Sequence, residues 1–65
     1  MKVIVNGKEE NIRESRLSSA LKELSLDLAY AAVAVNWKCI PKADLDRTEI
    51  KEGDILEILV PQAGG

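Results

Sequence analysis

The chain begins with a short apolar run of strand-forming residues and then becomes polar. Residues 2–5 are rich in β-branched side chains. Asn6-Gly7 follows at once and is a strong hairpin signal, because both residues tolerate positive φ. We therefore predict two strands joined by a tight turn, the second running from about Lys8 to Ile12, with Ile12 turned inward.

A helical spacing follows this predicted hairpin. Apolar residues recur at i, i+3, i+4 and i+7, namely Leu17, Ala20, Leu21 and Leu24, and they form one stripe along a helix. Ser15 precedes the stripe and is the predicted N-cap. This pattern indicates one amphipathic helix.

The second half of the chain returns to strand-like patterns. A loop is predicted around residues 26–30, and residues 32–35 read as a buried strand. Residues 36–38 then form a turn into a short strand, Cys39-Ile40, which Pro41 ends because proline cannot donate to a strand ladder. Residues 44–48 are predicted to cross irregularly to a turn at Gly53-Asp54, and the last predicted strand covers residues 55–60.

Two hairpin strands, a helix and further strands indicate an α+β fold. The order is that of a ubiquitin-like β-grasp: a mixed four- to five-stranded sheet with one main helix packed on one face. Period two in the last strand points Leu56, Ile58 and Val60 at the helix. It turns Ile55, Glu57 and Leu59 to the opposite face. Leu59 with Ile4 on that face is either a docking patch or ordinary scattered surface hydrophobicity, and both interpretations stay open.

Composition excludes several classes of function. With 65 residues, no histidine and one cysteine, the chain lacks the usual zinc and Ser-His or Cys-His constellations. A net charge of -2 with scattered basic residues argues against nucleic acid, and the apolar runs are too short to span a membrane. Glu9-Glu10, Asp44 and Asp46 are read as solvated surface charge. The absence of a signal-like leader and of a cysteine pair predicts a cytoplasmic protein.

Two further residues invite functional interpretations. Cys39 is predicted to be a small core or half-buried residue, because it lies in a short apolar strand with no histidine nearby. Trp37, beside the predicted turn, is either an interface anchor or a cap on the end of the core.

Four features together resemble the sulfur carrier family of thiamin thiazole biosynthesis, ThiS. They are Val5-Asn6-Gly7, Val33-Ala34-Val35-Asn36, Pro41-Lys42, and Gly53-Asp54 leading into the last strand and Gly64-Gly65. The resemblance covers essentially the whole chain. Pro61-Gln62 departs from it and also resembles the small subunit of molybdopterin synthase, a relative with the same fold and chemistry. That departure leaves the pathway open.

The resemblance implies a mechanism centred on Gly65. An E1-like adenylating enzyme converts its carboxylate to an acyl-adenylate, and a cysteine desulfurase or rhodanese-type donor supplies the sulfur of a thiocarboxylate. Thiazole synthase then takes that sulfur. The protein is thus a co-substrate rather than an enzyme. It binds no metal or cofactor itself, since ATP and magnesium belong to the adenylating partner.

The tail residues receive separate roles in this interpretation. Residues 1–60 form the domain, and residues 61–65 form a flexible C-terminal tail. Gly64 serves passage and flexibility, and Ala63 keeps the approach to Gly65 narrow. Pro61 stiffens the start of the tail. Partner contacts are assigned to Leu59, Ile4, Ala63 and Pro61. The rival functions are a ubiquitin-like modifier conjugated through Gly65 and an appended interaction module of β-grasp type.

Overall fold

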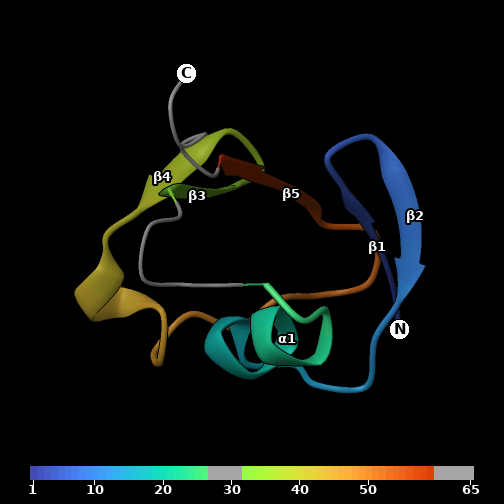
Figure 1. The fold of residues 1–65 in the computed structure, drawn as a ribbon, viewed down its shortest axis with the longest axis horizontal. Coiled ribbons are helices and arrows are strands. Elements are labelled where there is room, and N and C mark those ends of the chain that lie inside the picture. The colour runs from blue at the N-terminus through green and yellow to red at the C-terminus, as the bar shows by residue number, and fades with distance from the viewer. Residues whose placement is uncertain (27–31, 60–65) are drawn as a thin grey trace.

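The computed structural model describes residues 1–26 and 32–59. Their elements are β1 (Lys2–Val5), β2 (Lys8–Asn11), α1 (Leu17–Glu23), β3 (Ala32–Val35), β4 (Lys38–Ile40), the 3-10 turn η1 (Lys42–Asp44) and β5 (Ile55–Leu59). The strands form one sheet in the order β2-β1-β5-β3-β4, and α1 lies across one face of it (Figure 1). The predicted mixed sheet with one main helix on one face is confirmed, with five strands.

The last strand of the chain occupies the centre of the sheet. β5 pairs in parallel with β1 through Ile4↔Ile55 and Val5↔Leu56. On its other edge it pairs antiparallel with β3, from Ala32↔Leu59 to Val35↔Leu56. Both edges of β5 are therefore used, and residues from the two ends of the sequence are held together in the middle of the fold.

The core lies between α1 and the inner face of the sheet. Leu17, Ala20 and Leu21 are fully buried, and Leu24 packs at the edge of the core, as the predicted stripe requires. From the sheet, Val3, Val33, Leu56 and Ile58 meet them. Leu45 and Ile50, from the segment between β4 and β5, complete the buried set, together with Ile12. Burial of one such leucine contributes about 2 kcal/mol to stability.

The strand register confirms most of the predicted inward and outward positions. Leu56 and Ile58 face the core, whereas Leu59 is 70% exposed. Val60 lies outside the described residues. The prediction of a buried strand at residues 32–35 was wrong in part, because only Val33 among them is buried and Ala32 is exposed. The outer face of β3 is not covered by any element that the structure describes.

Two turns share one backbone conformation, with positive φ at both central residues. Asn6 has φ 50° and Gly7 has φ 83° in the β1–β2 hairpin that the sequence predicts. Asn36 has φ 49° and Trp37 has φ 70° in the β3–β4 hairpin. This geometry matches the twist of the flanking strands, but it suits glycine and asparagine far better than a bulky residue. Trp37 therefore holds a strained backbone position.

The start of α1 differs from the predicted Ser15 cap. The N-cap residue is Arg16, and no side chain caps the helix. Backbone carbonyls from the crossing segment take that role, because Leu17 N–H donates to Thr48 O at 2.8 Å and Ser18 N–H donates to Leu45 O at 3.1 Å. A side-chain cap is not needed where tertiary contacts already satisfy the first N–H groups.

The end of α1 is closed by backbone hydrogen bonds. Ser25, with φ 60°, donates its N–H to Lys22 O, and Leu26 N–H donates to Leu21 O. This is a Schellman arrangement with serine in the position that glycine usually holds. The predicted loop at residues 26–30 lies, after Leu26, outside the described residues.

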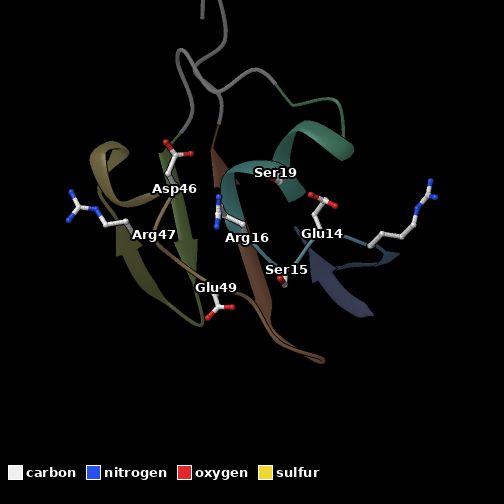
Figure 2. A pocket seen from close by; sticks show the side chains of 8 residues that line it. Glu14, Ser15, Arg16, Ser19, Asp46, Arg47 and Glu49 are labelled. Carbon is white, nitrogen blue, oxygen red and sulfur yellow. The ribbon is translucent and has the colours of Figure 1, made fainter.

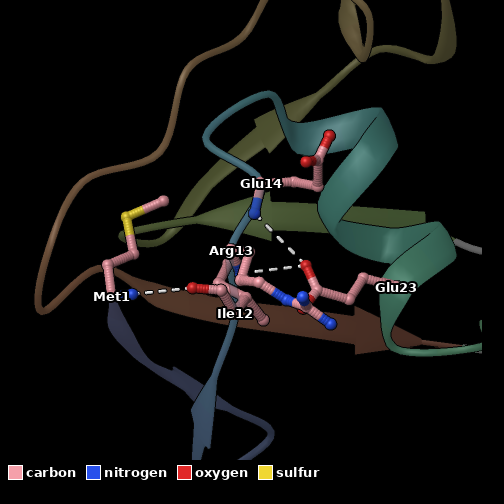
Figure 3. A network of polar contacts seen from close by, with 5 residues as sticks. All are labelled: Met1, Ile12, Arg13, Glu14 and Glu23. Atoms are coloured by element: carbon pink, nitrogen blue, oxygen red, sulfur yellow. Dashed lines mark hydrogen bonds and ion pairs between the residues drawn. The ribbon is translucent and has the colours of Figure 1, made fainter.

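The connection from β2 to α1 is held by the end of the helix and the start of the chain (Figure 3). The Met1 ammonium group donates to Ile12 O at 2.7 Å. The Glu23 carboxylate accepts from the N–H groups of Arg13 and Glu14 at 3.0 Å and 3.2 Å. These backbone bonds, above all that from Arg13, lower the pKa of Glu23 from its ordinary value. The Arg13–Glu23 ion pair, at 3.9 Å and largely exposed on the arginine side, adds little.

Replacing Trp37 with glycine is expected to stabilise the fold by about 0.5–1 kcal/mol, because it relieves a left-handed backbone strain of roughly 1–2 kcal/mol and loses little packing. The Trp37 side chain is 73% exposed. Trp37→Ala is the matched control, since it also removes the indole but keeps the Cβ that causes the strain. Urea unfolding measures both variants. A Trp37→Gly variant no more stable than Trp37→Ala contradicts the strain.

Glu23 is expected to make stability depend on pH below 4.5, the ordinary value for its carboxyl. Its pKa is lowered in the folded state, so its contribution is present above 4.5 and is lost as the pH falls through the folded pKa. In urea unfolding at a series of pH values, the advantage of the wild type over Glu23→Gln should shrink as the pH falls. Glu14→Gln removes a neighbouring carboxylate other than the one that accepts these hydrogen bonds, and it is the control for the loss of one charge. A pH-independent gap for Glu23→Gln disproves the linkage.

Candidate functional site

Some of the predicted site residues lie within the part of the chain that the structure describes, and others lie outside it. Pro61, Ala63, Gly64 and Gly65 lie outside the residues that the structure describes. Leu59 is the last residue of β5, six residues before Gly65 in the sequence. The described part of the candidate site is therefore the surface around the end of β5.

A shallow apolar depression lies on the outer face of the sheet beside Leu59. Its volume is about 210 Å³, and it spans β3, β4 and β5. The strand register places Ala32 next to Leu59, and it places Ala34 between Cys39 and Glu57. Its lining residues are Ala32, Val33, Ala34, Cys39, Glu57 and Leu59. Small side chains around one exposed leucine leave room for an apolar side chain of another protein.

Ile4 lies on the same outer face but not within this depression. It pairs with Ile55, four residues before Leu59 along β5, and four strand residues span about 13 Å. Glu57 lies between Ile55 and Leu59 on this face. The structure therefore brings Leu59 together with Ala32, Ala34 and Cys39, and it places Ile4 with Ile55 in a separate apolar spot.

The prediction that Cys39 is a core or half-buried residue was wrong. Cys39 is exposed, and its strand, β4, forms an edge of the sheet. Its partner across the strands is Ala34, and both residues line the outer depression. An apolar neighbour in the sequence does not bury a residue when its strand has one uncovered face.

Trp37 does not cap the core, so one of its two predicted roles was wrong. Its side chain is 73% exposed. The β3–β4 turn that carries it lies beside Ile55, at the end of β5 opposite Leu59. Trp37 therefore lies at the other end of β5 from Leu59, and a role as interface anchor stays a prediction.

A second hollow is polar and lies between the start of α1 and the segment that precedes β5 (Figure 2). Its volume is about 680 Å³. Three arginines and three carboxylates line it, so its charges balance, and the Arg47 side chain extends away from it (Figure 2). The lining residues are Arg13, Glu14, Ser15, Arg16, Ser19, Asp46, Arg47 and Glu49. Such a surface selects neither an anion nor a cation.

Residues 1–26 and 32–59 contain no group of three or more His, Cys, Asp or Glu residues placed to hold a metal ion. No helix within the same ranges is both long and apolar enough to cross a bilayer. The described surface thus offers an apolar contact area beside Leu59 and no enclosed pocket lined by reactive groups.

Sequence reasoning missed Ala32, Ala34 and Cys39 as neighbours of Leu59. A signal for the first two was present, because period two places Ala32 and Ala34 on the face opposite Val33. The sequence did not indicate that β3 is the strand that lies beside Leu59 in β5. Pairing between strands more than twenty residues apart leaves no trace in local periodicity.

A protein-family comparison decides the family of this chain. The model of the ThiS family matches residues 3–65. The chain belongs to the ThiS family. The predicted resemblance is therefore confirmed across nearly the whole chain, including the tail residues that the structure does not describe.

Solved structures of the ThiS family agree with this fold. The crystal structure of a thiamine biosynthesis protein (ThiS) from Geobacter metallireducens superposes with a TM-score of 0.81 at 29% identity, covering 100% of both chains. The solution NMR structure of a thiamine biosynthesis protein from the same organism gives a TM-score of 0.79 at 29% identity, covering 100% of this chain and 88% of that one. The β-grasp fold predicted from the order of elements is thereby confirmed.

A segment similar to this chain also occurs within a longer curated protein. The chain is 36% identical over 66 aligned residues to a protein named thiazole synthase from Paramagnetospirillum magneticum. The match covers 100% of this chain but only 20% of that protein. A ThiS-like segment therefore makes up about a fifth of a longer chain that carries the name of a synthase.

Proposed function

We propose that this protein carries sulfur for thiazole formation in thiamin biosynthesis, with the carboxylate of Gly65 as its reacting group. The observation that carries the proposal is the ThiS family match, which runs through residue 65. The thiamine biosynthesis structures, alike over the full length of this chain, support the thiamin pathway over the molybdopterin relative.

The terminal carboxylate of Gly65 is a poor electrophile, so the proposed reaction first activates it. A carboxylate oxygen of Gly65 attacks the α-phosphorus of ATP on an E1-like enzyme, which forms an acyl-adenylate and releases pyrophosphate. A persulfide from a cysteine desulfurase or rhodanese-type donor then displaces AMP, and a thiol cleaves the resulting S–S bond to leave a thiocarboxylate. The adenylating enzyme holds ATP and magnesium, and this chain acts as its co-substrate.

The residue types at the end of the sequence suit this task. Gly64 and Gly65 carry no side chains, and Ala63 adds only a methyl group. Residues 61–65 serve in the proposal as the segment that enters the partner's active site, and residues 1–60 serve as the domain that docks. Pro61 fixes one φ angle where the two parts join.

The outer face of the sheet serves as the docking surface in this proposal. Leu59 is the exposed anchor, and the small residues Ala32, Ala34 and Cys39 beside it receive a partner side chain. Ile4 with Ile55 forms a second apolar contact farther from the tail. Contact at the end of β5 suits the proposal because it brings the partner next to the segment that it must modify.

Thiazole synthase is the proposed acceptor of the sulfur. The relative from Paramagnetospirillum magneticum bears that name and contains a segment like this chain. A covalent link raises the effective concentration of two parts that work together. That arrangement supports a partnership between this carrier and a thiazole synthase.

Deleting Gly65, or replacing Gly64 with valine, is expected to abolish adenylation while leaving the folding stability within about 0.5 kcal/mol of the wild type. The deletion moves the terminal carboxylate by one residue, and the side chain of valine widens the C-terminal segment that enters the partner's active site. ATP–pyrophosphate exchange with the E1-like adenylating enzyme of the source organism measures the first effect, and urea unfolding measures the second. Gly53→Ala is the control in the exchange assay only, because Gly53 has φ 86° and alanine at such a φ costs folding stability. Full exchange activity in the deletion variant rules out the carrier proposal.

Replacing Leu59 with aspartate is expected to weaken binding to the adenylating enzyme by about tenfold or more, because a charge replaces an apolar anchor. Trp37→Asp is the matched control. Trp37 is equally exposed, at 73% against 70% for Leu59, but lies at the other end of β5. Isothermal titration gives both affinities. An affinity of Leu59→Asp equal to that of the wild type removes Leu59 from the docking surface.

A further inference from the structure

Two asparagines hold the central strand at its two ends. Asn6 and Asn36 each occupy the first central position of a hairpin turn, with φ near 50°. The Asn36 Oδ1 accepts from Ile55 N–H at 3.0 Å, at the start of β5. The Asn6 Oδ1 accepts from Ile58 N–H at 2.7 Å, near the end of β5. An asparagine side chain in a hairpin turn therefore hydrogen-bonds to the backbone of β5 near each of its two ends.

Asn6 makes a more complete contact than Asn36. Its Nδ2 also donates to Ile58 O at 3.1 Å, so one side-chain amide pairs with both backbone groups of a single residue. The Nδ2 of Asn36 donates instead to the Asp54 carboxylate. A side-chain amide has the donor and acceptor of a peptide group. Asn6 therefore acts as one additional strand residue beside β5.

The position of this contact follows from the course of β1. The last backbone pair between β1 and β5 is Val5↔Leu56, and Asn6 N–H donates to Leu56 O at 2.9 Å. β1 then turns away into the hairpin, two residues before the end of β5. Ile58 is only 4% exposed, so its backbone groups need partners within the protein. The Asn6 side chain supplies them where the neighbouring strand has ended.

The contact lies near the end of β5, the strand that directly precedes the reacting segment in the sequence. Ile58 precedes Gly65 by seven residues, a reach of at most about 25 Å when extended. On the β3 side, β5 stays paired through Ala32↔Leu59. On the β1 side, the Asn6 contact is the last one that the structure describes. The orientation of the end of β5 therefore depends on Asn6 as well as on β3.

We propose that Asn6 is a positioning residue: by clamping Ile58 it fixes the orientation of the end of β5, the strand that precedes residues 60–65, and so where a docked enzyme meets Gly65. This inference rests on the proposed carrier function. Loss of the clamp leaves the docking surface in place but loosens the base of the reacting segment. Misplacement of a reacting group by about 1 Å can lower a rate by up to about a hundredfold.

The test compares Asn6→Gly with Asn36→Gly. Glycine tolerates the positive φ of both turns, so each variant removes one side-chain contact to β5 without new backbone strain. Asn36→Gly is the matched control because its contact lies at the other end of the strand. The assay is ATP–pyrophosphate exchange with the E1-like adenylating enzyme of the source organism, run over a range of carrier concentrations to separate kcat from KM.

Asn6→Gly should lower kcat by about tenfold to a hundredfold with KM within about twofold of the wild type, whereas Asn36→Gly should leave both unchanged. Amide hydrogen exchange gives a second reading: Asn6→Gly should speed exchange at Ile58, and Asn36→Gly at Ile55. If Asn6→Gly does not fold, Asn6→Asp takes its place in both measurements, because it keeps the acceptor and loses the donor.

Equal kcat values for the Asn6 and Asn36 variants overturn the positioning role, whether both are unchanged or both are lowered. A rise in KM at constant kcat overturns it too, since that result assigns Asn6 to docking. Failure of the carrier function is distinguishable from these outcomes, because the wild type itself then supports no exchange.

Discussion

β5 is held along both edges, in parallel by β1 and antiparallel by β3, and the other elements are arranged around it. Its Leu56 is fully buried between the sheet and α1, where one leucine contributes about 2–3 kcal/mol. A domain of this length buries a smaller share of its surface on folding than a larger domain does, so its stability margin is narrow. The same strand leads into the residues of the proposed reaction. Folding and the placement of Gly65 therefore share one element.

The two faces of the sheet have different roles because only one of them is covered. The inner face meets α1 and the segment before β5, which closes the core and satisfies the first N–H groups of the helix. The outer face keeps Leu59 exposed beside small residues. No reactive cleft lies in the described parts of the chain.

Local patterns in the sequence predicted the hairpin at Asn6-Gly7, the helical stripe and the inward positions of Leu56 and Ile58. Each depends on residues close together in the chain. The predictions for Ser15 and Cys39 were wrong because distant segments decide them: Thr48 and Leu45 carbonyls replace the cap, and an uncovered sheet face exposes the thiol. The pairing of Asn6 with Ile58 links residues 52 positions apart, and no local pattern encodes it.

The most direct test of the carrier function is a fragment mass spectrum of the protein isolated from its own cells. The account predicts that one oxygen is replaced by sulfur at Gly65. Fragmentation is needed because oxidation of Met1, Trp37 or Cys39 adds nearly the same mass. Sulfur localised to Gly65 supports the carrier function. An ordinary carboxylate at Gly65, even after incubation with the adenylating enzyme, ATP and a persulfide donor, contradicts it.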